Sequence, residues 1–211
     1  MTAESVASLP YELKNRSGGR RSEICDTALL LFEEHGYAQT SMQQLADAMG
    51  LNKATLYHYV TTKTELLFEI NRVITEIAVQ EIEAILAADL TATEKLTRII
   101  EITLVRIRDY RRHVVVFFQE QAYLTGRYRQ RLDVQRSRFE RAVEAILDEA
   151  FASGEFRTAD RLAVKLSLYG VIDTAHIWYK PEGRLGPRQM AEYLADVLLS
   201  GLLPRNDHAN A

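Results

Sequence analysis

Apolar residues recur at every third or fourth position along most of this chain, the spacing that places them on one face of an α-helix. No stretch alternates apolar and polar residues between two hairpin turns, as a half-buried strand does. Proline breaks helices, and residues 11–180 contain none, because the four prolines are Pro10, Pro181, Pro187 and Pro204. The pattern therefore predicts an all-α fold.

Signals for helix starts and ends divide this pattern into about nine helices. Three pairs have the spacing of a capping box, in which two residues three positions apart satisfy each other's backbone N–H groups: Thr40 with Gln43, Thr62 with Glu65, and Thr91 with Glu94. Asn52 is suited to cap a short helix, and Gly36 stands where a helix end favours a positive φ. The predicted helical ranges are 22–35, 40–50, 53–59, 62–87, 91–109, a helix that ends before Gly126, 127–152, 158–179 and 187–201.

The chain is predicted to hold two helical domains with a short segment at each end. Residues 1–19 are polar and lack periodicity, which is typical of a flexible arm, and residues 205–211 are predicted to be a disordered tail. Residues 20–66 form a small N-terminal domain, and residues 67–204 form a larger helical domain.

Composition excludes several classes of protein. The 211 residues carry a formal net charge of −3, which gives no support to binding nucleic acid over the whole surface. The single cysteine, Cys25, excludes an internal disulfide and a cysteine-rich zinc site, and it fits a reducing cytoplasm. The longest apolar run, "VVVFF", is far shorter than the roughly 20 residues that cross a bilayer. We therefore expect a cytoplasmic protein with no membrane partner.

The segment "ADAMGLNKATLY" has the form of a helix-turn-helix, in which a short turn swings the second helix outward. Ala46 and Ala48 are small enough for close packing of the two helices, and Gly50 permits the turn. Residues 48–64 include Lys53 and Lys63 and no acidic residue. A surface that faces phosphates needs this local absence of negative charge more than it needs a basic protein.

The sequence "ALLLFEEHGYAQTSMQQLADAMGLNKATLYHYVTTKTELLFEI" resembles the N-terminal DNA-binding domain of the TetR family of bacterial transcriptional regulators. The resemblance covers about residues 20–70, with Val60 where the family usually has Phe. It implies phosphate contacts by Thr40, Tyr57, His58 and Lys63. Lys53, Ala54 and Thr55 are the residues expected to approach base edges. Alternatively, Tyr57 and Tyr59 could be aromatic residues of the core. Arg16, Arg20 and Arg21 could either reach DNA or belong to a solvated arm.

Two helices near the end of the chain are apolar enough to predict a subunit interface. The segment "RLAVKLSLYGVIDTAHIWY" is apolar nearly all round, and "MAEYLADVLLSGLL" carries an apolar stripe. In the resembled family the matching helices form a four-helix bundle across a two-fold axis, while the alternative is ordinary core within one chain. The predicted interface residues are Leu166, Ile172, Tyr193, Leu194, Val197 and Leu198.

The remaining helices of the larger domain are expected to enclose a small apolar or amphipathic effector. The predicted lining residues are Arg106, Phe117, Phe118, Gln121, Tyr123, Tyr169 and Trp178, and each could instead be plain core. Arginines gather at residues 106–112 and 127–131, and "IWYKPEGRLGPRQMAEYLADVLLSGL" resembles the matching segment of regulators that sense fatty acyl-CoA. The predicted effector is therefore a CoA thioester, with a lipophilic drug-like compound as the alternative.

Functions of other classes find little support. The chain has no HExxH, GxSxG, P-loop or GxGxxG motif, and no cofactor is expected. Asp173 and His176 lie one helical turn apart and could share a metal, although a buried hydrogen-bonded pair is the simpler interpretation. An enzyme and a helical adaptor without DNA binding stay as alternatives. The sequence favours a dimeric repressor that an effector releases from a palindromic operator.

Overall fold

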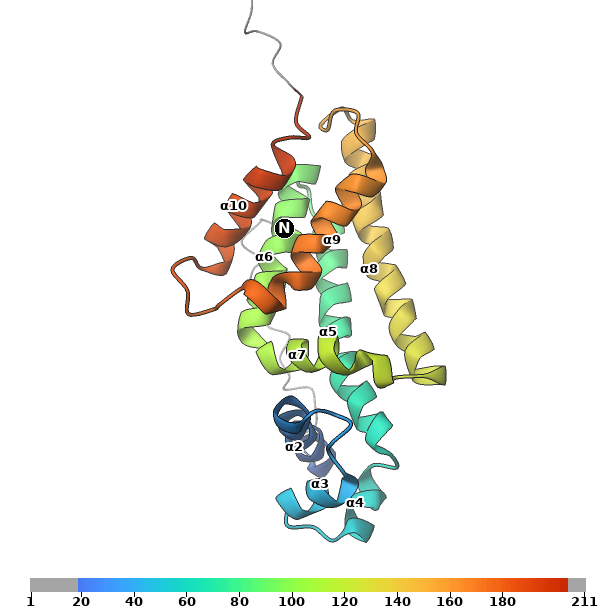
Figure 1. Ribbon diagram of the computed structural model, residues 1–211. Coiled ribbons are helices and arrows are strands. Elements are labelled where there is room, and N and C mark those ends of the chain that lie inside the picture. Colours follow the sequence, from blue (N-terminus) through green and yellow to red (C-terminus); the bar gives the residue numbers. More distant parts are fainter. Residues whose placement is uncertain (1–18, 205–211) are drawn as a thin grey trace, which may run out of the picture. The chain divides into compact units, whose positions relative to one another are not determined.

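The computed structural model describes residues 19–204, and within this range every regular element is a helix, as the sequence predicts (Figure 1). The predicted arm, apart from Gly19, and the predicted tail at residues 205–211 lie outside the described residues. The elements are α2 (Arg20–His35), α3 (Met42–Ala48), α4 (Lys53–Tyr59), α5 (Lys63–Leu86), α6 (Ala92–Asp109), α7 (Arg111–Glu120), the 3-10 turn η2 (Gln121–Tyr123), α8 (Gly126–Ala152), α9 (Arg161–Trp178) and α10 (Pro187–Leu199). No helix in the described range is long and apolar enough to span a membrane.

The described residues group into two compact units. The N-terminal unit contains residues 19–77 and 110–136, and the C-terminal unit contains residues 78–109 and 137–204. Helices α5 and α8 contribute residues to both units. The sequence-based division after residue 66 differs from this grouping, because α7 and the first turns of α8 pack with the N-terminal helices.

The core of the N-terminal unit explains why α7 belongs to it. Residues of α2, α3, α4 and α5 pack around Phe32, Leu45 and Leu56, which are almost completely buried. Val116 of α7 and Leu132 of α8 join the same cluster. Each large apolar side chain buried in this way contributes about 1.5–3 kcal/mol. The three N-terminal helices and the start of α5 therefore share one core with a segment that follows them by more than 40 residues.

Helix caps follow the sequence in most places, with one shift of a single residue. Asn52 Oδ1 accepts from Thr55 N at 2.7 Å, and the predicted capping box of Thr91 with Glu94 is present. The box that opens α3, however, is made by Ser41 with Gln44. The prediction of Thr40 with Gln43 was wrong because the Thr40 side chain is buried and turned back toward α2.

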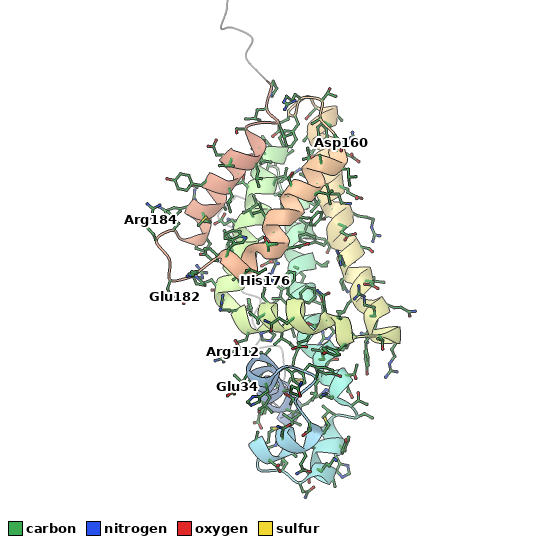
Figure 2. The ribbon with its side chains drawn as sticks, in the orientation of Figure 1. Glu34, Arg112, Asp160, His176, Glu182 and Arg184 are labelled. Atoms are coloured by element: carbon green, nitrogen blue, oxygen red, sulfur yellow. The ribbon has the colours of Figure 1, made fainter. Side chains whose placement is uncertain are left out.

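The C-terminal unit is built on α6, which packs against α9 and α10. The Glu155 carboxylate covers the start of α6 by accepting from the N–H groups of Ala92 and Thr93, at 2.9 and 2.7 Å. Burial alone would raise the pKa of Glu155, but these hydrogen bonds outweigh it and lower that pKa. Asp160, at the start of α9, caps that helix, and His176 lies near its other end (Figure 2).

Candidate nucleic-acid interface

Helices α3 and α4 form the predicted helix-turn-helix. The turn occupies residues 49–52, and Gly50 has a φ of 63°, a backbone conformation that glycine adopts without strain. Leu51 N donates to Ala46 O at 2.9 Å, which closes the turn against the end of α3. A four-residue connection of this kind fixes the direction of α4 relative to α3.

One face of α4 is anchored in the core and the other faces solvent. Leu56 is fully buried, and Val60, the residue that stands where the resembled family has Phe, is also buried just past the helix end. Tyr57 is 44% exposed and Tyr59 is 39% exposed, so neither is a core aromatic. The outward residues of α4 are Lys53, Ala54, Tyr57, His58 and Tyr59, with Thr55 partly exposed. This is the acid-free surface that the sequence predicts for contact with DNA.

The Thr40 side chain, predicted to contact a phosphate, lies inside the protein. That side chain is 2% exposed, and its hydroxyl donates to Gly36 O at 2.9 Å. A hydroxyl has one proton to give, and here that proton is used inside the protein. The structure therefore assigns Thr40 to the packing of the loop between α2 and α3, and its hydroxyl is not presented to a phosphate.

The Lys63 ammonium has partners inside the protein, and its predicted contact with a phosphate stays a prediction. The ammonium donates to Tyr37 O at 2.6 Å and to Thr40 O at 2.7 Å, and it lies 3.4 Å from Ala38 O. The same ammonium stands over the Tyr37 ring, 4.3 Å from its centroid. Burial lowers the pKa of Lys63, against a smaller opposing effect of Glu120. All three N–H donors of the lysine point to the loop, so in this geometry Lys63 holds the protein's own backbone.

The two arginines at the start of α2 have partners within the N-terminal unit. Arg21 donates to Glu65 Oε1 at 2.5 Å and to Tyr59 O at 2.8 Å, so it links α2 to the end of α4 and the start of α5. Arg20 pairs with Glu23 on its own helix at 2.7 Å. Arg16 lies outside the described residues. The bond from Arg21 neutralises Glu65, the acidic residue just after the acid-free segment.

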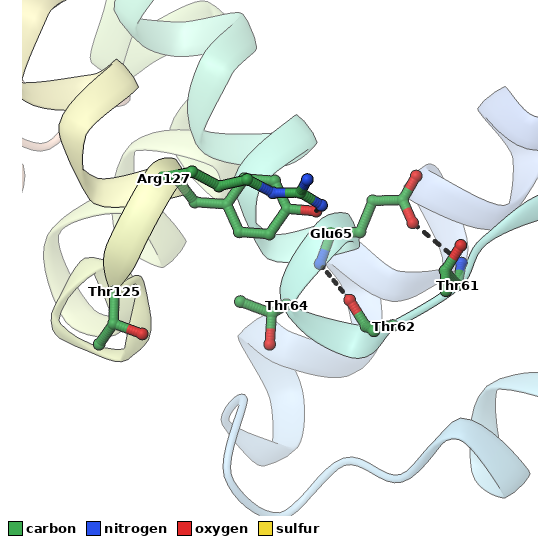
Figure 3. A pocket seen from close by; sticks show the side chains of 7 residues that line it. Thr61, Thr62, Thr64, Glu65, Thr125 and Arg127 are labelled. Atoms are coloured by element: carbon green, nitrogen blue, oxygen red, sulfur yellow. Dashed lines mark hydrogen bonds between the residues drawn. The ribbon is translucent and has the colours of Figure 1, made fainter.

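A polar hollow of about 450 Å³ lies beside the start of α5 (Figure 3). Within it, Glu65 accepts from Thr61 N at 2.9 Å, and Glu65 N donates to Thr62 Oγ1 at 3.1 Å, so these contacts cap α5. The lining residues are Thr61, Thr62, Thr64, Glu65, Thr125, Arg127 and Tyr128. None of them is among the predicted lining residues of the effector chamber, although Arg127 belongs to the arginine group at 127–131 from which the sequence predicts a phosphate-bearing effector.

The predicted effector residues are divided between the two units. Phe117, Phe118, Gln121 and Tyr123 belong to the N-terminal unit, and Arg106, Tyr169 and Trp178 belong to the C-terminal unit. Arg106 is buried and donates twice to Glu81 Oε2, at 2.5 and 3.0 Å. The prediction did not foresee this ion pair, which joins α5 to α6 and occupies the guanidinium of Arg106.

The other clustered arginines fall into two groups. Arg108 pairs with Asp109, Arg112 with Glu33, and Arg129 with Asp133. Among residues 19–204, Arg111, Arg127 and Arg131 have no acidic partner. Arg127 and Arg131 lie over the rings of Tyr128 and Phe68 instead, at 4.9 and 4.8 Å from the ring centroids. These two guanidinium groups keep their charge available to an anion.

Helices α9 and α10 expose apolar side chains, as expected for a subunit interface. Leu166, Tyr193 and Val197 are 60%, 63% and 77% exposed. Leu194 and Leu198 are partly buried, whereas Ile172 is buried inside its own unit. The exposed apolar face also includes Leu162 and Ile177, which the sequence analysis missed. The spacing of four residues from Leu162 to Leu166 was the available signal.

Asp173 and His176 are not buried together, although the sequence suggested that they would be. Asp173 is exposed, and the His176 ring donates from Nδ1 to the backbone carbonyl of Asp173, at 2.8 Å. Within the described range, no three His, Cys, Asp or Glu side chains come together as a metal site. The contact is a local bond within the last turns of α9.

Comparison with known proteins identifies matches over both parts of the chain. Residues 24–70 match "Bacterial regulatory proteins, tetR family", and residues 89–202 match "Tetracyclin repressor-like, C-terminal domain". The chain is 26% identical over 197 residues to the HTH-type transcriptional repressor KstR2 of Rhodococcus jostii (strain RHA1), covering 92% of this chain and 96% of that protein.

Two solved structures have similar folds. PfmR, a TetR family transcriptional regulator from Thermus thermophilus, has a TM-score of 0.76 and 30% identity, covering 86% of this chain and 99% of PfmR. AibR in complex with isovaleryl coenzyme A and operator DNA has a TM-score of 0.74 and 27% identity, covering 85% of this chain and 97% of AibR.

Proposed function

The chain belongs to the tetR family of DNA-binding transcriptional regulators, and from this we propose that it is a homodimeric repressor that a small effector releases from a palindromic operator. The surface of α4 is the observation that carries the proposal. Lys53, Tyr57 and His58 stand on its exposed side, in a segment without acidic residues. A short helix that presents these groups can enter the major groove and contact its phosphates and base edges.

Lys53 is the cation of α4 that faces solvent, and its replacement tests this surface. Lys53→Met removes one phosphate or base contact per protomer without disturbing the buried side of the helix. If Lys53 binds a phosphate, the slope of log affinity against log salt falls by about 0.9 per protomer. Fluorescence anisotropy with a duplex that the wild-type protein enriches from a random pool measures this slope. An unchanged slope and affinity would remove α4 from the interface.

Dimerisation through α9 and α10 is supported by their exposed apolar residues. A symmetric dimer presents the same face of both protomers to each other, and it spaces two recognition helices for the two halves of a palindrome. Leu166, Tyr193 and Val197 would then be covered by the partner. Single-copy binding by α4 alone is weak, because the helix is short and the whole chain has a net charge of −3.

The effector that we propose is a CoA thioester. AibR, which is 27% identical to this chain, was solved with isovaleryl coenzyme A. Arg127 and Arg131 support a phosphate-bearing ligand, because arginine forms strong charge-assisted hydrogen bonds with phosphate oxygens and these two have no acidic partner in the described part of the chain. Helix α5 contains residues of both units and has neither proline nor glycine, so it can carry a displacement from one unit to the other.

Titration of the protein–DNA complex with isovaleryl coenzyme A and palmitoyl coenzyme A tests this effector class. We expect one of them to weaken binding to the enriched duplex by about 5- to 150-fold, the range of ordinary allosteric coupling. Replacing both Arg127 and Arg131 by alanine should weaken thioester binding by about 10-fold or more, because each loses charged hydrogen bonds. Arg141→Ala, which removes an exposed arginine of α8 in the C-terminal unit, is the matched control. Release by tetraphenylphosphonium, with no response to either thioester, would instead identify a sensor of lipophilic cations.

A further inference from the structure

Helix α7 ends in a buried carboxylate that binds the loop leading into the helix-turn-helix. Glu120, the last residue of α7, is 9% exposed. Its Oε1 accepts from Tyr37 N at 3.2 Å, across 83 positions of the sequence. Burying a carboxylate costs free energy unless the group is paired or hydrogen-bonded. The groups that bind the Glu120 carboxylate therefore indicate its structural role. Here the partner is the backbone of the α2–α3 loop.

Lys63 holds the same loop through its carbonyl groups. The ammonium binds the carbonyls of Tyr37 and Thr40, while the carboxylate of Glu120 binds the N–H group of Tyr37. Glu120 also favours the charged form of Lys63, because the two groups attract each other through space. The loop is thus held by an anion on its donor and by a cation on its acceptors.

The Tyr37 ring lies beneath the Lys63 ammonium, which is 4.3 Å from the ring centroid, and packs against other aromatic rings. It packs edge-on against Phe32 of α2, with ring centroids 5.2 Å apart, and it lies 5.1 Å from the ring of Tyr123 in η2. Its hydroxyl is 3.0 Å from Thr64 Oγ1 at the start of α5. Tyr37 therefore contacts α2, α5 and η2 at once, and a shift of the loop would disturb all three contacts.

This loop sets the position of α3 and, through the tight turn, that of α4. Thr40, whose carbonyl Lys63 binds, directly precedes the Ser41 cap of α3. Helices α3 and α4 are joined by only four residues, so they move together. We propose that Glu120 is a positioning residue for operator recognition, which holds the loop at residues 36–40 so that α3 and α4 fit the major groove.

This role rests on the proposed operator binding. It makes α7 necessary for recognition of the operator, although α7 need not contact DNA. Glu120 is buried and negatively charged, so it cannot itself bind a phosphate. Removal of the Glu120 carboxylate should therefore weaken DNA binding by lowering the fraction of molecules in which α4 is correctly placed. Sequence-specific binding depends on that fraction, whereas non-specific attraction to phosphates depends on charge alone.

Three substitutions in the whole 211-residue chain test this role. Glu120→Ala removes the acceptor, Glu120→Asp shortens it by one methylene, and Glu120→Gln keeps an oxygen at the same distance from Tyr37 N. Gln119→Ala changes the exposed neighbouring residue of α7 and is the control. Hydrogen exchange of the Tyr37 amide shows directly whether the bond is present. Anisotropy then compares the duplex enriched by the wild-type protein with an unrelated duplex, over a range of salt concentrations.

We expect Glu120→Ala to weaken binding to the enriched duplex by about 10-fold, if the correctly placed fraction falls to about one tenth. Binding to the unrelated duplex and the salt slope should stay as in the wild type, and the Tyr37 amide should exchange faster. Glu120→Gln should restore protection of Tyr37 and most of the affinity, and Gln119→Ala should change nothing. If Glu120→Ala does not fold, Glu120→Asp is expected to show the same losses to a smaller degree.

Equal affinity of wild type and Glu120→Ala for the enriched duplex would overturn the inference. So would an equal loss for both duplexes, because a merely structural role lowers the amount of folded protein and not its selectivity. Failure of the proposed function gives a different result, since the wild-type protein would then enrich no duplex at all.

Discussion

Val197→Glu is expected to convert the dimer into monomers and to weaken operator binding by about 100-fold or more, the gain that joining two binding modules usually gives. Val197 is 77% exposed in the isolated chain, while the opposite side of α10 buries Ala191, Ala195 and Leu199. The substitution therefore leaves the protomer's own core intact. In a symmetric dimer, however, it brings two unpaired carboxylates into an apolar contact, where each loses its hydration without compensation.

Sedimentation velocity measures the mass of the Val197→Glu protein, and fluorescence anisotropy measures its affinity for the operator. Gln80→Glu adds the same charge at an exposed position of α5 and should leave both the mass and the affinity unchanged. Thermal unfolding of the Val197→Glu monomer confirms that the loss is not one of folding. A Val197→Glu protein that stays dimeric, or a monomer that binds the operator as tightly as the dimer, contradicts an interface at α10.

Lys63→Met is expected to lower the free energy of unfolding by about 2 kcal/mol, because charged hydrogen bonds to two backbone carbonyls are lost. Methionine keeps much of the apolar stem over the Tyr37 ring but cannot donate to Tyr37 O or Thr40 O. Operator binding should weaken as the loop loosens. The salt slope should nevertheless stay the same, since the ammonium is bound to the protein and not to a phosphate.

Urea unfolding and a salt titration of operator binding test Lys63→Met, with Lys53→Met as the comparison. Lys53 is exposed and should show the opposite result, with a lower salt slope and little change in stability. If Lys63→Met lowers the slope by about 0.9 per protomer, Lys63 binds a phosphate in the complex and must leave the loop to do so. That outcome would restore the role implied by the family resemblance.

Local chemistry made the helices and the turn predictable. Asn52 and Thr91 carry the side chains that helix starts need, and Gly50 supplies the backbone freedom that the turn requires. Leu56 and most apolar residues of α5 recur at the helical period and are buried. In each of these cases the residues that determine the structure are close together in the sequence.

The errors arose where partners are far apart in the sequence. Thr40 and Ser41 both carry hydroxyl groups, and only the burial of Thr40 decides which of them caps α3. Arg106 was predicted to face a ligand, but it forms an ion pair with Glu81. That pair could not be recognised in the sequence, because Glu81 lies 25 positions away on another helix. The periodicity of α7 likewise gives no sign that Glu120 binds the backbone of Tyr37. Such pairings depend on how the helices pack against one another. The pattern of neighbouring residues in a single sequence does not determine that packing.

Selection of duplexes from a random DNA pool by this 211-residue chain tests directly whether the protein is a dimeric repressor that reads DNA through α4. We expect enrichment of an inverted repeat with two equal half-sites, bound by a dimer with a steep salt dependence. Lys53→Met should lower that salt dependence, and Val197→Glu should weaken the binding by about 100-fold or more. Enrichment of no sequence, or of a single site without two-fold symmetry bound by a monomer, would contradict a dimeric repressor that reads DNA through α4.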